Sequence, residues 1–227
     1  MTWFQKPPLG TPLDWGNSLN KGTVLHLAIN EGHGDKVNDL SLYGNHGTLN
    51  GCTWDDGGVR FNGTSDYINC GNRASLNCDA ITISVWVKLL KSCSYASPII
   101  DKVFLKGGKL NGYGISDCGI FEFGNGTDNF EINPGLSWDH NIWYHYAITY
   151  TDGRIDFYRD GILVKTDTST NGNIAANVRY LFIGCRGGAT VYYFHGSIGE
   201  VRIQNRVLSQ KEVKSYYINP WQVYLDD

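Results

Sequence analysis

The protein is a chain of 227 residues, which is enough for one large domain with a substantial core. Aromatic residues make up 13% of the chain and glycine occurs 28 times, whereas methionine occurs once, and this composition favours strands and turns over packed helices. The net charge of −3 leaves no basic surplus to neutralise phosphates, so we expect no nucleic-acid partner. No apolar run approaches the ~20 residues of a membrane span, so we expect no membrane partner either.

Residues 1–22 are predicted to form an extended, proline-rich N-terminal arm, followed by one folded domain over residues 23–227. Three of the six prolines lie in this arm, and proline fixes φ and removes a donor, so the segment suits a central strand poorly. It lacks a basic region followed by an apolar one, so no signal peptide is expected and the protein should be made and left in a cytoplasm, unless the chain has been trimmed. Apolar side chains recur along the arm, which should therefore lie against its own domain or a neighbouring subunit. The candidates for partner attachment are Trp3, Phe4, Leu9 and Trp15.

An almost continuous apolar run, VLHLAI at residues 24–29, predicts a buried strand. Loops follow with the sequences NEGHG at 30–34 and DLSLYGNHGTL at 39–49, and their glycines can adopt positive φ in tight turns. His33 and His46 lie in these loops, and hydrogen bonding to the backbone is a more ordinary role for them than metal binding or catalysis.

Two further stretches show strand patterns. GVRFNGTSDYI at residues 58–68 predicts a hairpin of two short strands joined by an Asn62-Gly63 turn. ITISVWVK at residues 81–88 alternates cleanly, with isoleucine and valine on one face and Trp86 among the polar residues of the other. Trp86 could line a sugar-binding face, but a structural tryptophan covered by a loop is the favoured interpretation.

The middle of the chain, residues 89–141, is the least regular, and long loops at one rim are where such a scaffold carries recognition residues. Residues 143–164 predict a three-stranded meander, because Asp-Gly turns at 152–153 and 160–161 separate its strands. Further short strands are predicted, between glycine-containing turns, around residues 99–102, 113–116, 120–123, 130–132 and 178–184.

The closing stretch, FHGSIGEVRIQNRVLSQKEVKSYY at residues 194–217, combines a strand with a short helix. Val201 and Ile203 alternate with charged neighbours, which predicts a half-buried strand with one charged face. Ser209 and Glu212 have the spacing of a capping box, so a helix should begin there.

Taken in order, these motifs resemble those of LamG-like, concanavalin A-like jelly-roll domains. The closing segment of that family typically reads F-x-G-x-I-D-E-V-R-I-Y-N-R-A-L-S-x-x-E, which residues 194–212 follow except that Gly199 replaces the aspartate. The resemblance covers about residues 23–217. It implies an all-β fold, a two-sheet antiparallel jelly-roll sandwich of concanavalin A-like type with a short C-terminal helix.

Six cysteines are present and none forms a C-x-x-C pair, which makes a zinc ribbon or a thioredoxin-type motif unexpected. Buried free thiols are the simpler interpretation without a secretory signal, although three disulfides would also fit the even number. Cys70–Cys78 and Cys93–Cys118 are the pairs to test first, since each is fairly close in sequence.

No catalytic residue is predicted, and we expect that the protein is not an enzyme. Glucan hydrolases of this fold place carboxylates two positions apart on one strand, which suits the ~5–5.5 Å separation of retaining hydrolysis. None of the five glutamates has a carboxylate partner at that spacing, and neither G-x-S-x-G nor H-x-x-x-H occurs.

Calcium is the one cofactor that the resemblance raises. The first and last motifs become neighbours in the family fold, so the resemblance implies that Glu31, Asp39, Asn45 and Glu200 would converge to hold a structural calcium ion with oxygen ligands. The missing aspartate at Gly199 weakens this hypothesis. The alternative, with no cofactor, is that these side chains hydrogen-bond to loop N–H groups.

Three functions stay open, because fold does not give function. The resemblance extends to LamG-like domains encoded among bacteriophage structural genes. It therefore implies a virion structural or decoration protein at the virion surface, attached by its arm to a capsid or tail protein or to its own copies. The alternatives are a carbohydrate-binding module, cytoplasmic or extracellular, and a glycoside hydrolase. Because aromatic faces stack on sugars and on proteins alike, the candidates for ligand binding are Trp54, Trp138 and Tyr192.

Overall fold

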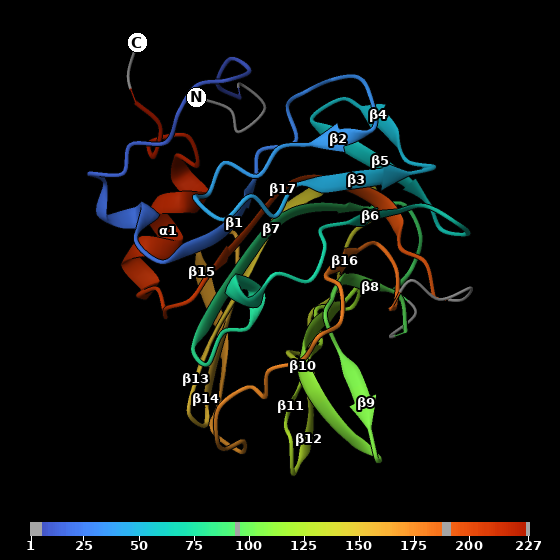
Figure 1. The fold of residues 1–227 in the computed structure, drawn as a ribbon, viewed down its shortest axis with the longest axis vertical. Helices are drawn as coiled ribbons and strands as arrows, with labels where there is room; N and C mark the ends of the chain where they lie inside the picture. Colours follow the sequence, from blue (N-terminus) through green and yellow to red (C-terminus); the bar gives the residue numbers. More distant parts are fainter. Residues whose placement is uncertain (1–5, 94–95, 188–191, 226–227) are drawn as a thin grey trace.

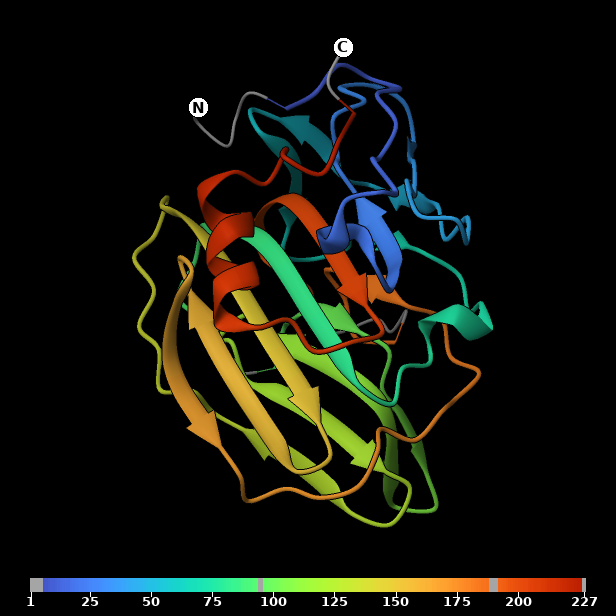
Figure 2. The same cartoon turned by 90° about the vertical axis from the view of Figure 1, so that its left-hand side faces the viewer.

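A computed structural model describes residues 6–93, 96–187 and 192–225 of the chain. Two antiparallel sheets face each other as a sandwich, and one helix, α1 (Gln210–Ile218), lies outside it (Figures 1 and 2). The predicted all-β jelly-roll fold with a short C-terminal helix is confirmed. Within the described residues, no helix has the length and hydropathy that crossing a bilayer requires.

Each sheet is assembled from strands that are distant in sequence. The first sheet has the order β15 (Ile162–Asp167), β14 (Arg154–Arg159), β13 (Trp143–Thr151), β7 (Ile81–Leu89), β17 (His195–Gln204), β5 (Gly58–Asn62) and β4 (Thr53–Asp55), and β1 (Thr23–Leu27) also pairs with β17. The second has the order β12 (Asn129–Ile132), β11 (Phe121–Asn125), β10 (Lys109–Ser116), β8 (Pro98–Asp101), β16 (Phe182–Ile183), β6 (Tyr67–Asn69), β3 (Gly47–Asn50) and β2 (Lys36–Val37), and β9 (Phe104–Lys106) pairs with β10. Short 3-10 helices occupy Ser18–Asn20 and Ala74–Leu76.

The main core lies between the two sheets, where alternate side chains of each strand point inward. Phe123 of β11 and Tyr150 of β13 show how the layers interdigitate, because their ring centroids are 4.4 Å apart across the sandwich. Both side chains are fully buried.

Two local predictions about strands need correction. The Asn62-Gly63 turn does not close a hairpin, because β5 pairs with β17 in the first sheet whereas β6 pairs with β16 in the second. The turn instead carries the chain from one sheet to the other. The strand predicted over residues 178–184 is also shorter, since only Phe182 and Ile183 pair with other strands.

A second apolar cluster covers the outer face of the first sheet. It is built from the N-terminal segment, α1 and the C-terminal tail, and includes Leu13, Leu19, Val213, Tyr216 and Tyr224. This layer overturns the prediction that β17 is half-buried. The charged face of β17 is enclosed, since Glu200, Arg202 and Gln204 are only 3%, 2% and 1% exposed.

The described part of the predicted arm, residues 6–22, packs along its own domain. Leu13 forms a β-bridge with Tyr224 and is buried, and the Asn20 side-chain amide donates to the Val223 carbonyl at 2.8 Å. Leu9 and Trp15 remain 58% and 41% exposed. The other two residues predicted to attach a partner, Trp3 and Phe4, lie outside the described residues.

A disulfide joins Cys93 to Cys118, one of the two pairs proposed for testing. The interpretation that all cysteines are free thiols is therefore wrong for this pair. Cys70, Cys78 and Cys185 are buried free thiols, and Cys52 is a half-buried free thiol. Burial raises the pKa of the Cys52 and Cys78 thiols to about 12, so both stay protonated and unreactive at neutral pH.

Candidate functional site

A pocket of about 610 Å³ opens at one rim of the sandwich. Its walls come from the turn after β5, the loop after β7, the turn between β10 and β11, and the segment that leads into β17. The polar and aromatic residues that the argument uses among its lining are Asn62, Lys91, Asp117, Tyr192, Tyr193 and His195.

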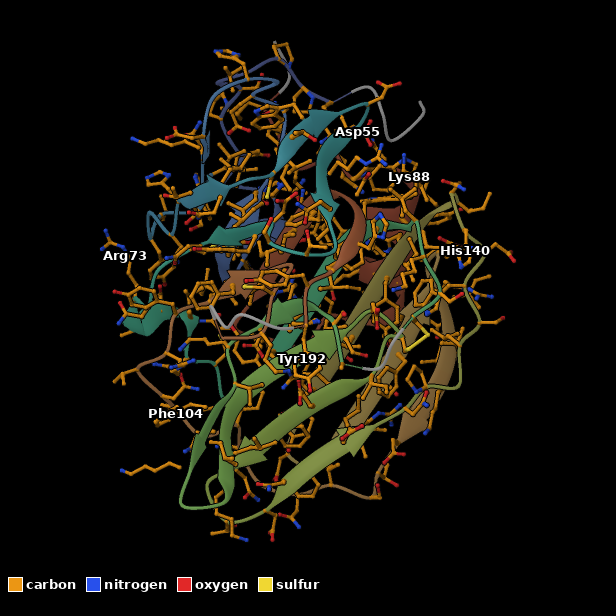
Figure 3. The ribbon with its side chains drawn as sticks, turned by 90° about the vertical axis from the view of Figure 1, so that its right-hand side faces the viewer. Asp55, Arg73, Lys88, Phe104, His140 and Tyr192 are labelled. Carbon is orange, nitrogen blue, oxygen red and sulfur yellow. A yellow bond between two sulfur atoms is a disulfide. The ribbon has the colours of Figure 1, made fainter. Side chains whose placement is uncertain are left out.

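Tyr192 is the most distinctive residue of this pocket. Its φ of 65° is rare for a residue with a side chain, and such backbone strain often accompanies function. The ring is 51% exposed, and Figure 3 shows Tyr192 near the middle of the face turned to the viewer. Its neighbour Tyr193 is held by a β-bridge to Cys185. The strained backbone therefore presents a half-exposed aromatic ring at the pocket.

The walls of the pocket are fixed by local contacts. Cys93 and Cys118 follow two lining residues, Ser92 and Asp117, so the disulfide ties two walls together. A Cβ atom on Gly63, whose φ is 77°, would lie 2.8 Å from the Cβ of His195, so only glycine allows the turn after β5 to approach the start of β17 this closely.

The structure does not bring the three predicted ligand-binding aromatics together. Of these, Tyr192 lies in the rim pocket. Trp54 donates its indole N–H to the Gly34 carbonyl at 2.9 Å and lines a separate pocket beside Pro7 and Leu9. Trp138 packs edge-on against Tyr146, with ring centroids 5.4 Å apart, and lies against the main core. The part these three play in ligand binding stays a prediction.

The residues predicted to hold calcium are each engaged by protein groups. Asp39 accepts hydrogen bonds from the backbone N–H groups of His26, Ser41 and Asn45 at 2.7–2.9 Å. Glu31 accepts from Asn38 at 2.7 Å. The Asn45 side-chain amide donates to the Val24 carbonyl at 2.7 Å.

Glu200, the fourth predicted ligand, belongs to a buried ionic network. Its Oε1 lies 2.8 Å from Arg202 Nε and 3.1 Å from His26 Nε2. Burial alone would raise the pKa of Glu200, but the Arg202 charge and the His26 contact lower it to about 2. Burial, followed by the Arg202 charge, lowers the pKa of His26 to about 4, so the histidine is neutral at pH 7.

A lysine already occupies the space between the first and last motifs. Lys6 Nζ donates to the carbonyls of Ala28, Ile29 and Gly199 at 2.8, 2.7 and 2.6 Å. This ammonium would repel a calcium ion, so the arrangement does not fit the metal. The part of the chain that the structure describes contains no group of three or more His, Cys, Asp or Glu side chains able to hold a metal ion.

Carboxylates do meet on the second sheet, across strands rather than along one. Glu122 of β11 is directly opposite Glu131 of β12, and Asp101 of β8 and Glu122 both face Gly114 in register. Arg186 bridges Asp101 and Glu122: its Nη1 lies 4.0 Å from the Asp101 carboxylate, and its guanidinium donates to both carboxylate oxygens of Glu122. Burial raises the pKa of Asp101 to about 7. A search for spacing along one strand cannot detect this cluster.

Comparison with known proteins identifies the family. The Laminin_G_3 sequence model, described as the concanavalin A-like lectin/glucanases superfamily, matches residues 62–214. The chain belongs to this superfamily. No curated protein sequence matches it.

Solved structures of similar fold include a sialidase and a domain of an arabinanase. A Trypanosoma rangeli sialidase complex with 2,3-difluorosialic acid matches with a TM-score of 0.65 and 17% identity, over 90% of this chain and 34% of that one. Domain 4 of AbnA, a GH43 extracellular arabinanase from Geobacillus stearothermophilus, in complex with arabinotriose, matches with a TM-score of 0.67 and 16% identity, over 85% of this chain and 97% of that one. The chain thus spans about a third of the sialidase. At these identities the likeness concerns the fold.

Proposed function

We propose that the protein is a non-catalytic carbohydrate-binding module that holds a glycan in the rim pocket. The observation that carries the proposal is Tyr192, a half-exposed ring on a strained backbone at the pocket. Aromatic faces stack on sugar rings, and the neighbouring side chains of Lys91, which is exposed, and His195, which is half-buried, offer groups that hydrogen-bond to hydroxyls. The complex of AbnA domain 4 with arabinotriose supports this class of ligand for the fold.

Binding without bond cleavage suits the side chains available. Among the described residues lining the pocket, Asp117 is the one carboxylate, whereas hydrolysis by the usual route needs two. On the second sheet, the Arg186 guanidinium donates hydrogen bonds to both carboxylate oxygens of Glu122. This pairing leaves Glu122 poorly placed to act as a nucleophile or base. A sensitive reducing-sugar assay on the polysaccharides that bind should therefore detect no product.

The experiment is a screen on immobilised glycans with two tyrosine variants. Tyr192→Ala should weaken binding at least about tenfold, because it removes the ring on which the sugar stacks and exposes that face of the sugar to water. Tyr43→Ala is the matched control, because Tyr43 is 46% exposed on a loop that does not line the pocket. Equal binding by wild type and Tyr192→Ala would refute the assignment of this pocket.

The virion role is a second proposal, in which the arm attaches the module to a capsid or tail protein or to another copy. Its support is that Leu9 and Trp15 are large apolar side chains left exposed on the arm. Deleting the arm would also remove Leu13 and Leu19 from the second apolar cluster, so substitution is the cleaner test. Leu9→Asp with Trp15→Asp should abolish recovery in purified virions without lowering Tm, and recovery equal to wild type would reject the arm as the attachment.

A further inference from the structure

A positively charged groove lies away from the rim pocket, beside the hairpin formed by β9 and β10. Two adjoining pockets of about 570 and 220 Å³ share Val178 and together form this hairpin groove. Phe104, labelled in Figure 3, marks its position on the molecule. The residues that the argument uses are Phe104, Lys106, Lys109, Val178, Arg179 and Tyr180.

The hairpin places two like charges against each other. Lys106 and Lys109 are directly opposite in register, on either side of a Gly107-Gly108 turn whose φ values are 59° and 80°. Like charges at opposed positions destabilise a strand pair. Neither lysine takes part in any of the ion pairs formed among the described residues, so none of these pairs offsets the repulsion.

A third cation lies beneath the groove. Lys102 is fully buried, and its ammonium donates to the Asn177 carbonyl at 3.3 Å, the Asn177 side-chain oxygen at 3.1 Å and the Arg179 carbonyl at 3.1 Å. These partners are neutral, and burial lowers the pKa of Lys102 to about 8, which leaves most of it charged at neutral pH. A buried charge that forms no ion pair with a carboxylate of the described residues is costly, and an anion in the groove would offset the cost.

The floor of the groove is rigid. The Asn177 side-chain amide donates to the carbonyls of Lys102 and Asn111, both at 2.9 Å, and so fixes the loop to β10. Arg179 lies over the Phe104 ring, with its guanidinium carbon 5.7 Å from the ring centroid. Positioned charges on a rigid floor are the features that favour binding without large losses of entropy.

Apolar side chains accompany the cations. Val178 is 78% exposed and Tyr180 is 46% exposed. The Tyr180 ring presents a face on which a sugar ring can stack, and Val178 adds apolar contact beside it. Among the described residues that line the two pockets there is no Asp or Glu, although the whole chain has a net charge of −3. The groove therefore complements an anion that has apolar ring faces.

From this geometry we infer that the hairpin groove binds a polyuronate, a polysaccharide with a carboxylate on each ring. A ring resting on Val178 or Tyr180 would bring its carboxylate beside the flanking lysines. This surface is distinct from the rim pocket, so the protein would contact glycans at two places. The two sites can be tested separately.

The test is affinity electrophoresis of the full chain in gels that contain polygalacturonate. Wild type should be retarded, and added salt should weaken the retardation because the contacts are between exposed charges. Lys106→Glu with Lys109→Glu should weaken retention at least about tenfold. Lys211→Glu with Lys214→Glu on α1 makes the same change in net charge at exposed positions outside the groove, and should keep retention within about twofold. Far-UV circular dichroism and Tm establish that both variants fold.

Several outcomes would overturn the inference. Equal loss in both double variants would show that net charge, and not the groove, governs retention. A preference for dextran sulfate, or for a single-stranded oligonucleotide, over polygalacturonate would assign the groove to another anion. Tyr192→Ala should leave polygalacturonate retention intact, so failure of the rim pocket and failure of the hairpin groove give different results.

Discussion

The buried network beneath α1 predicts a large and specific effect of losing one charge. Arg202 is 2% exposed, and it bonds to Glu200, donates to the Pro220 carbonyl at 3.0 Å, and lies 4.3 Å from the centroid of the Tyr216 ring. Arg202→Met would keep most of the apolar volume of the side chain. It would leave Glu200 buried without its main partner.

The size of the effect follows from the Glu200 pKa, which is about 2 in the fold against an ordinary 4.5. A difference of this size in pKa corresponds to roughly 3 kcal/mol of stability at neutral pH. Breaking a buried ion pair by removing one partner typically costs about 3–5 kcal/mol of stability, which agrees with the value from the pKa. For a chain of this length, Tm should fall by roughly 10 °C.

The assay is urea denaturation at pH 7, followed by fluorescence, on wild type, Arg202→Met, Glu200→Gln and the double variant. If an unpaired carboxylate causes the loss, Glu200→Gln in the Arg202→Met background should restore at least about 2 kcal/mol of unfolding free energy. A loss below about 1 kcal/mol in Arg202→Met, or a double variant no more stable than the single one, would refute this reasoning.

Two further predictions concern protons and metal. Burial lowers the pKa of His145 to about 4 from an ordinary 6.5, so its neutral form stabilises the fold above pH 6.5 and this stability is lost as pH falls towards 4. His145→Phe should flatten the fall of Tm across that window, and an unchanged pH profile would show that His145 does not govern it. Calcium should not stabilise the protein, because the Lys6 ammonium already donates hydrogen bonds to the carbonyls of Ala28, Ile29 and Gly199, where the first and last motifs meet. Equal Tm in excess calcium and in EDTA is the expected result, whereas a rise of several degrees with calcium would contradict it.

Local sequence was enough to predict features that depend on neighbouring residues. The Ser209–Glu212 capping box is present as expected, and α1 begins directly after Ser209. The Asp-Gly turns at 152–153 and 160–161 join β13, β14 and β15 into the predicted meander. Capping and two-residue turns are decided within a few residues, so their signals can be found in the sequence.

The family resemblance supplied the fold, but not which faces are covered. Glu200 and Arg202 alternate with apolar residues, and that pattern does not reveal that an arm and a helix will enclose the charged face. The same limit applies to the Asn62-Gly63 turn, which has the sequence of a hairpin yet connects two sheets. Pairing partners are chosen by long-range packing, which overrides local turn preference.

The chain sequence by itself therefore determined the all-β class, the strand alternation, the final helix and Tyr192 as a candidate for binding. Only the tertiary structure decided that Tyr192 joins Asn62, Lys91 and Asp117 at one rim. It also decided that Lys102, Lys106 and Arg179 gather at one groove while Glu122 and Asp101 share Arg186 elsewhere. The physical reason is that a binding surface is made by contacts between segments far apart in the chain, and those contacts exist only once the sheets have paired.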